Sequence, residues 1–266
     1  MPIKRKDVSD IDGIVLSYSR VRSYFDCPLA YKYHYVDKLP EEPAIPLMLG
    51  SLTHAILEKV VQHEIDDKDY VCPSIQELAI SLWEEILSSN DPNCTVDPQK
   101  LEEAFQMAVT LSKLYLDDPD RPNIRAVETH YITENPVYVT DMAKYYLQGY
   151  IDGEIKVKPD YAHILDYKTS KNKWGEYDGA NEFQPNFYGL LLDVDEIEMT
   201  YPILLKHKTP KIQYITTIRD KHQIHAAQKL IQIFVQSTEQ QMYYPKRGGW
   251  KCNPNYCSFY DKCMEW

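Results

Sequence analysis

Long apolar runs are missing from this 266-residue chain. None reaches the roughly eighteen residues that a membrane-spanning helix needs, so no such helix is expected. The basic stretch from Met1 to Lys6 is not followed by an apolar segment, so a secretory signal is not expected either. Internal repeats and low-complexity stretches are also missing. We therefore expect an intracellular, cytoplasmic protein with one large domain or a core with one helical insertion.

An excess of positive charge is missing as well. The chain has 29 Lys and Arg against 40 Asp and Glu, a net charge of −11. A protein that coats DNA along its length is usually basic, because Lys and Arg neutralise phosphates, so this class is disfavoured. A nuclease stays compatible with the charge, because its acidic centre holds a divalent cation and its basic residues can be local. The simpler interpretation is that the charge serves solubility.

Hydrophobic periodicity predicts helices in the first half of the chain and a mixture of strands and helices after Pro122. Helices are predicted over 17–36, with Ser17 as the cap, and over 47–65, 74–88, 98–116, 182–193 and 220–242. Segments rich in β-branched residues and tyrosine predict strands over 125–133, 144–157, 162–168, 197–206 and 211–218. The tail from Tyr243 is expected to be irregular.

Two carboxylates and a lysine are predicted to meet on neighbouring strands. Asp152 lies on one strand, and Asp166 and Lys168 lie on the next, after a turn at 158–160. Side chains alternate along a strand, so Asp166 and Lys168 should share a face and Tyr167 should point away. Carboxylates bind hard cations such as Mg²⁺, and a lysine stabilises developing negative charge. The alternative is a surface ion pair, which is common on strands.

The stretch from Gly149 to Asp152, followed by Asp166-Tyr167-Lys168, resembles the active-site motif of the PD-(D/E)XK nucleases, and the RecB-like family in particular. Two further elements strengthen the resemblance. Gly50 to His54 is similar to an upstream Gly-x-x-x-His element, and Gln184 to Tyr188 to a later Gln-x-x-x-Tyr element. The resemblance spans residues 17–263, nearly the whole chain.

This resemblance implies a single domain over 1–266 of mixed α/β class. It comprises a mainly helical part at 17–120, a restriction-endonuclease-like core at 121–242 with a central mixed sheet flanked by helices, and a cysteine-rich tail at 243–266. It also implies catalytic roles for Asp152, Asp166 and Lys168. Mg²⁺ or Mn²⁺ would be bound by His54, Asp152, Asp166 and the backbone carbonyl of Tyr167, and Gln184 and Tyr188 would hold the nucleic-acid strand.

Other residues near these motifs are weaker candidates. His54 and Glu58 share a helix face, so both can point inward. Glu128, on the first predicted strand, is interpreted as structural or as a neighbour of the site. Segments that border the site carry candidate contacts to the DNA backbone, Arg20, Arg22, Lys171, Lys173, Lys206 and Lys208, and candidate stacking residues, Tyr18 and Trp174.

Three of the six cysteines, Cys252, Cys257 and Cys263, lie in the last fifteen residues. Disulfides are not expected, because the cytosol keeps thiols reduced. With Cys27 in the first predicted helix they make four thiolates, a set that suits zinc or an iron–sulfur cluster.

One early and three late cysteines resemble the iron–sulfur subgroup of RecB-like nucleases, which includes the AddB nuclease domain, CRISPR-associated RecB-like exonucleases and exonuclease V. The resemblance implies a 4Fe–4S cluster that ties the first helix to the tail. Four residues separate Cys252 from Cys257, where two are usual, so zinc and no metal stay open as alternatives. Cys72 and Cys94 lie outside the pattern and are expected to be plain thiols.

The expected function is a metal-dependent exonuclease acting on single-stranded DNA ends, in recombination, repair, replication or phage DNA metabolism. One alternative is an accessory nuclease that trims DNA only inside a complex, with a separate helicase or recombination protein or during CRISPR spacer acquisition. Another is a non-catalytic DNA-binding scaffold on a nuclease fold. An oligomer is compatible with the sequence, and no membrane contact is expected.

Overall fold

The computed structural model describes residues 3–4, 11–41, 44–88, 97–249, 251–254 and 256–266. Cys94 and the segment 90–93 between two predicted helices lie outside these residues. The described strands form one nine-stranded sheet: β1 (Ile3–Lys4), β2 (Ile14–Ser17), β3 (Ala126–Ile132), β4 (Tyr138–Val139), β5 (Lys144–Lys158), β6 (Tyr161–Leu165), β7 (Lys168–Ser170), β8 (Glu196–Leu205) and β9 (Lys211–Asp220). The main path runs β1-β3-β5-β6-β8-β7, with β2 and β4 on β5 and β9 on β8.

The sheet is mixed, as expected. β5 is antiparallel to β3 and to β6, whereas β6 and β7 are both parallel to β8. The helices are α1 (Tyr18–Asp26), α2 (Pro28–Tyr31), α3 (Ile45–Asp66), α4 (Ile75–Ser88), α5 (Pro98–Leu116), α6 (Asp178–Asn181), α7 (Gln184–Leu192), α8 (Lys221–Glu239) and α9 (Tyr260–Met264), with a π-helical turn η2 (Lys32–Val36) after α2. Among the described helices none is long and apolar enough to cross a membrane.

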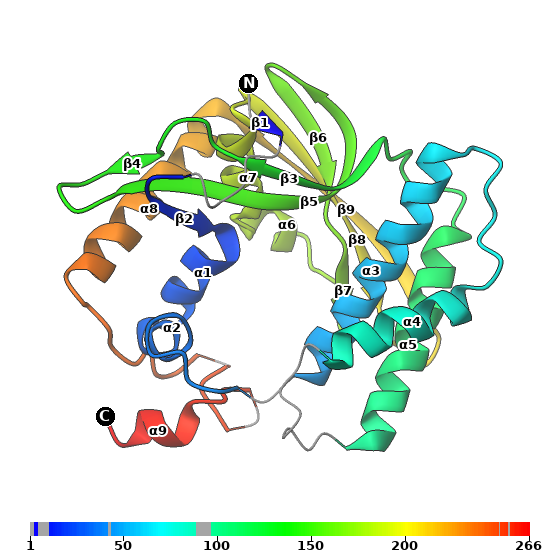
Figure 1. The fold of residues 1–266 in the computed structure, drawn as a ribbon, viewed down its shortest axis with the longest axis horizontal. Helices are drawn as coiled ribbons and strands as arrows, with labels where there is room; N and C mark the ends of the chain where they lie inside the picture. Colours follow the sequence, from blue (N-terminus) through cyan, green and yellow to red (C-terminus); the bar gives the residue numbers. More distant parts are fainter. Residues whose placement is uncertain (1–2, 5–10, 42–43, 89–96, 250, 255) are drawn as a thin grey trace.

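Two hydrophobic cores cover the sheet. The first joins β5 and β8 to α1, α7 and α8 through residues such as Leu147, Phe187 and Phe234. The second joins α3, α4 and α5 to the sheet through Leu52 and Leu165, among others. Figure 1 shows the α3–α5 group on one side of the molecule and α1, α2 and the C-terminal tail on the other. The mixed α/β architecture with helices flanking a central sheet is therefore confirmed.

Two predicted elements are interrupted in the structure. The single helix predicted over 17–36 is wrong, because Cys27 is extended, with φ −161°, and ends α1 before Pro28 begins α2. The predicted cap at Ser17 is confirmed, since its side chain accepts a hydrogen bond from the N–H of Arg20. The C-terminal tail is not wholly irregular, because it contains α9.

The second interruption falls in the strand predicted over 162–168. β6 ends at Leu165, and β7 begins at Lys168 on the other side of an irregular step at Asp166 and Tyr167. The argument from alternation along one continuous strand is therefore wrong. Asp166 and Lys168 nevertheless meet, because β6 and β7 both follow the same neighbour, β8.

Candidate active site

The motif carboxylate Asp152 lies where the β5–β6 hairpin opens. Gly153 pairs with Leu165, the last residue of β6, so Asp152 lies beside the chain that continues into Asp166 and Tyr167. The backbone N–H of Tyr167 donates a hydrogen bond of 2.8 Å to Asp152 Oδ2. The irregular step after β6 is therefore fixed to β5 by the carboxylate itself.

His54 reaches the same place from α3. Its Nδ1 lies 3.2 Å from Asp152 Oδ2, and its Nε2 lies 3.0 Å from the backbone carbonyl oxygen of Tyr167. The structure thus brings together three of the groups that the sequence singled out: the imidazole of His54, the carboxylate of Asp152 and the carbonyl of Tyr167. Glu58 lies one helical turn further along α3 and is half-buried.

Glu128 completes this cluster, although its sequence interpretation assigned it no direct part. Ligand atoms of His54, Glu128 and Asp152 lie within 4.8 Å of one another, the one group of three so placed in the described part of the chain. On β3, Glu128 lies between the residues that pair with Gly153 and Ile151, so it faces Asp152 across the strands. The sequence carried no local signal for this contact, because it depends on the register of β3 against β5.

The backbone at Glu128 has φ 46°, in the left-handed region that a glutamate rarely adopts. Such strained positions concentrate at functional sites, where the surrounding structure holds them in place. Here the strain accompanies a change of face on β3. Val127 packs in the second core, whereas Tyr131 packs in the first.

The cluster is electrostatically balanced by a protonated histidine. Burial disfavours the charge on His54, but the carboxylate of Asp152 outweighs burial and raises the pKa of the ring to about 9. Burial alone would raise the pKa of Asp152, yet His54 and the N–H of Tyr167 hold it below its ordinary value. Burial, reinforced by Asp152, raises the pKa of Glu128 to about 7. The imidazolium therefore supplies the positive charge that a bound cation would otherwise supply to this cluster.

Asp166 and Lys168 form an ion pair beside the cluster. The ammonium of Lys168 contacts Asp166 Oδ2 and donates a hydrogen bond of 3.0 Å to Gln184 Oε1. The amide of Gln184 donates a bond of 2.6 Å to Asp166 Oδ1. Burial raises the pKa of the Asp166 carboxyl. Burial opposes the charge on Lys168, but Asp166 outweighs it and raises the lysine pKa, so the ammonium is retained.

Gln184 and Tyr188 both lie inside the protein. Gln184 is 6% exposed and Tyr188 is 9% exposed. The Tyr188 hydroxyl donates a bond of 2.8 Å to the backbone carbonyl of Tyr150. In this structure the side chains of Gln184 and Tyr188 therefore orient Asp166, Lys168 and β5. The sequence had suggested instead that both would contact a nucleic-acid strand.

The basic and aromatic candidates are dispersed around the site. Arg20 donates to the hydroxyl of Tyr31, and Arg22 pairs with Glu182 at 2.7 Å. The four candidate lysines, Lys171, Lys173, Lys206 and Lys208, lie on or beside the segments that follow β7 and β8, and all but the half-buried Lys206 are exposed. Tyr18 bonds to Glu182, and Trp174 packs against Tyr201.

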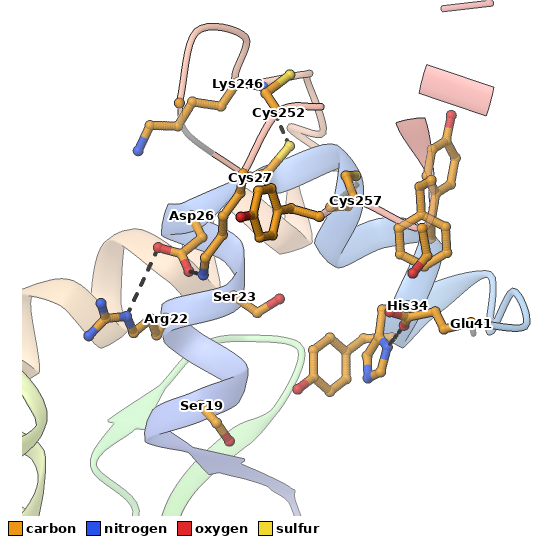
Figure 2. Close-up of a pocket in the computed structure, with 18 of the residues that line it drawn as sticks. Ser19, Arg22, Ser23, Asp26, Cys27, His34, Glu41, Lys246, Cys252 and Cys257 are labelled. Carbon is orange, nitrogen blue, oxygen red and sulfur yellow. Dashed lines mark hydrogen bonds and ion pairs between the residues drawn. The ribbon is translucent and has the colours of Figure 1, made fainter. Parts of the chain in front are cut away.

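One pocket of about 930 Å³ is lined by the four cysteines that the sequence grouped together, Cys27, Cys252, Cys257 and Cys263. The same pocket extends to Lys168 and Gln184. Figure 2 shows Cys27, Cys252 and Cys257 facing this pocket together with Arg22 and Ser23 of α1. Cys27, Cys257 and Cys263 also pack against Leu29, Tyr33 and Phe259. The chain therefore brings the end of α1 and the C-terminal tail together around these thiols.

The donor set around His54 suits a divalent cation. Two carboxylates, a carbonyl oxygen and an imidazole are ligands that Mg²⁺ or Mn²⁺ accepts, with waters to complete the shell. The arrangement can therefore hold a cation against a phosphate, with a lysine ammonium as a second positive charge. Among the cysteines within the described residues, no three sulfur atoms lie within 4.8 Å of one another.

One solved structure shares features of this fold at low sequence identity. An inferred exonuclease from Eubacterium rectale aligns with a TM-score of 0.52 and 10% identity, over 94% of this chain and 87% of that one. Rai1 from Scheffersomyces stipitis aligns with a TM-score of 0.28 and 12% identity, over 90% and 73%. No curated protein is significantly similar in sequence. At 10% identity the first alignment supports the fold alone.

The family of the chain follows from its sequence together with the site. Residues 15–264 match the PD-(D/E)XK nuclease superfamily, which is nearly the full length. The match includes the hairpin that carries Asp152 and Asp166 and the step that carries Lys168. This chain belongs to the PD-(D/E)XK nuclease superfamily.

Proposed function

We propose that this protein is a Mg²⁺- or Mn²⁺-dependent deoxyribonuclease that hydrolyses phosphodiesters at single-stranded DNA ends, in recombination, repair or replication of cellular or phage DNA. The observation that carries the proposal is the cluster of His54, Glu128 and Asp152 beside the Asp166–Lys168 pair. A divalent cation held there would polarise the phosphodiester and lower the pKa of a coordinated water.

The residues take distinct roles in this proposal. His54, Asp152, Glu128 and the carbonyl of Tyr167 would hold the cation, and Asp166 would supply a further carboxylate. The ammonium of Lys168 neutralises charge that develops on the phosphate. Gln184 keeps Lys168 and Asp166 in register through its two hydrogen bonds.

The DNA strand would approach along the pocket that leads from Lys168 past α1. This pocket is lined by Tyr18, Arg22 and Trp174, which provide aromatic faces and one guanidinium. Arg20 and Lys171 are proposed to contact the DNA backbone at its borders. An acidic protein with few cations along such a path is suited to one strand end, because a coated duplex needs many phosphate contacts.

Cleavage of end-labelled single-stranded DNA tests the proposal. Wild type should degrade the strand in Mg²⁺ or Mn²⁺, and Lys168→Ala should lose this activity. Lys100→Ala removes an exposed lysine on α5 and should cleave like wild type. Equal cleavage by wild type and Lys168→Ala would contradict the assigned role of Lys168, and a wild type that cleaves nothing in either metal would contradict the proposed activity.

The four pocket cysteines are proposed to bind a 4Fe–4S cluster that joins α1 to the tail. A tetrahedral zinc site with Zn–S bonds of about 2.3 Å would bring its sulfurs to within about 4 Å of one another. No three of the described thiols lie within 4.8 Å of one another, and in a four-iron cluster each thiolate binds a different iron. Iron and sulfide analysis of anaerobically purified protein is the test. Cys257→Ser should lose iron, Cys72→Ser should retain it, and zinc in place of iron would contradict the assignment.

A further inference from the structure

We propose that Tyr150, backed by His130, is a stacking platform for a nucleobase. This base is next to the phosphodiester that is cut at the cluster of His54, Glu128 and Asp152. This inference rests on the proposed nuclease function and adds to it a substrate-binding subsite of its own. Its ligand is an unstacked base of a single strand, because a base inside a duplex has no free face to offer.

The platform and the cluster are successive cross-strand pairs of β3 and β5. His130 pairs with Tyr150, and Glu128 lies opposite Asp152 two residues further along. Tyr150 and Asp152 are two residues apart on β5, which places them about 7 Å apart along the strand. That spacing is within the reach from a phosphate to the base of its own nucleotide. A phosphate at the cluster therefore brings a neighbouring base over Tyr150.

The ring of Tyr150 stacks on His130, and the residue is largely exposed. Its centroid lies 4.4 Å from that of His130, with an angle of 14° between the planes. His130 Nε2 is in turn 3.1 Å from Gln148 Oε1, which fixes the orientation of the imidazole. Although His130 covers one ring face, 55% of Tyr150 remains exposed. A fixed aromatic face loses little conformational entropy when a base stacks on it.

The platform is also connected to the catalytic lysine through hydrogen bonds. Tyr188 donates to the carbonyl of Tyr150, and Gln184, one turn earlier on α7, bonds to Lys168. Gly149 permits this close approach, because a Cβ there would lie 2.8 Å from the ring of Tyr188. A change in the position of Tyr150 is thus coupled to the segment that holds Lys168.

The charge of the protein favours this mode of binding. Glu128 and Asp152 repel a phosphate backbone unless a cation intervenes, and the whole chain has a net charge of −11. Stacking on an aromatic ring needs no positive charge and tolerates every base, because each base has a π face. The platform therefore supplies affinity for the DNA strand without positive charge. Basic residues at this position would instead compete with the metal for the carboxylates of the cluster.

Base stacking can be measured with 2-aminopurine, whose fluorescence is quenched when it stacks. Single-stranded oligonucleotides that carry the probe at successive positions from the end would be bound to the protein in Ca²⁺. We expect one position at which the quenching is present in wild type and Tyr150→Phe and is lost in Tyr150→Ala. At that position Tyr150→Ala should weaken binding roughly 5- to 150-fold, and an abasic residue should remove the difference between wild type and Tyr150→Ala.

A second stacked His–Tyr pair provides the matched control. The ring centroids of His63 and Tyr70 lie 4.7 Å apart, with an angle of 29° between the planes. His63 is nine residues along α3 from His54. Tyr70→Ala should leave the quenching pattern and the affinity unchanged. The platform is overturned if no probe position depends on Tyr150, or if Tyr70→Ala has the same effect as Tyr150→Ala. Cleavage by wild type in Mg²⁺, with no dependence on Tyr150 in any assay, would refute the platform and leave the proposed nuclease activity standing.

Discussion

His54 holds Asp152 at 3.2 Å through Nδ1, while its Nε2 lies 3.0 Å from the carbonyl of Tyr167. Both ring nitrogens thus face acceptors, an arrangement that only the doubly protonated ring satisfies. A metal ion that binds at the same place must displace a proton from His54. The atoms that make these hydrogen bonds are therefore the same atoms that would bind the metal.

Metal binding should consequently depend on pH. The pKa of His54 is raised to about 9, so the ring is charged below this pH and each bound cation releases a proton. The affinity for Mn²⁺ should rise between pH 7 and 9, above the pKa of Glu128, by up to about tenfold per pH unit. Calorimetry in buffers of different ionisation enthalpy measures both the affinity and the protons released. An affinity that is constant across this range would show that His54 does not meet the metal.

Replacement of Glu128 by glutamine should raise the stability of the protein without metal and weaken its binding of metal. Folding raises the pKa of this carboxyl from 4.5 to about 7. Between pH 4.5 and 7 the folded wild type therefore binds more protons than the unfolded chain. Its free energy of unfolding falls as the pH rises through this range. Glu128→Gln removes that loss. At pH 8 without metal it should be more stable than wild type by roughly 1–2 kcal/mol, allowing for screening at a half-buried site.

Added Mn²⁺ should reverse this order, because the glutamine variant binds the cation more weakly, by about tenfold or more. Thermal unfolding with and without Mn²⁺ measures both effects. Glu196→Gln, at an exposed strand residue, should change neither quantity. If Glu128→Gln responded to Mn²⁺ as strongly as wild type does, Glu128 would be outside the metal site.

The sequence predicted the main elements of this site and missed the local backbone that joins them. Periodicity indicated the hairpin of β5 and β6, so the approach of Asp152 to Asp166 could be anticipated. The irregular step at Tyr167 could not, since the segment reads as one continuous run of strand-forming residues. Its geometry depends on Asp152, fourteen residues before Asp166, which accepts the hydrogen bond from the N–H of Tyr167.

Glu128 shows a different limit. Its contact with Asp152 depends on the register of β3 against β5 and on a left-handed φ, neither of which has a local sequence signature. The break after α1, by contrast, had a visible cause in Cys27-Pro28, because a residue before proline avoids the helical conformation.

Gln184 should act as a positioning residue for Lys168 and Asp166. Its amide bonds to both, at 3.0 and 2.6 Å, and it is buried. Gln184→Ala should lower kcat roughly 10- to 100-fold, the range found when a group that orients metal-site residues is lost, with little change in KM. Gln184→Glu offers an acceptor to Lys168 but repels Asp166, so it should not restore the rate. A purely raised KM in Gln184→Ala would instead indicate that Gln184 contacts the strand.

Arg219 should be a main determinant of stability for the segment that leads into α7. This arginine is 6% exposed on β9, and one of its terminal nitrogens donates to the backbone carbonyls of Gly179, Ala180 and Glu182, at 3.2, 2.8 and 3.0 Å. Its Nε donates to the side chain of Asn186 on α7. Arg219→Met preserves much of the volume but leaves these acceptors without their donor.

An unsatisfied buried acceptor costs about 1–3 kcal/mol, so Arg219→Met should lower the free energy of unfolding by about 3 kcal/mol, with partial relief from water. Urea denaturation, with the slope compared between variants, measures this loss. Lys229→Met, at an exposed position on α8, controls for the removal of a charge and should change stability by less than about 0.5 kcal/mol. Equal, small losses in the two variants would show that water replaces Arg219 at these carbonyls, and the segment before α7 would then be held by its packing alone.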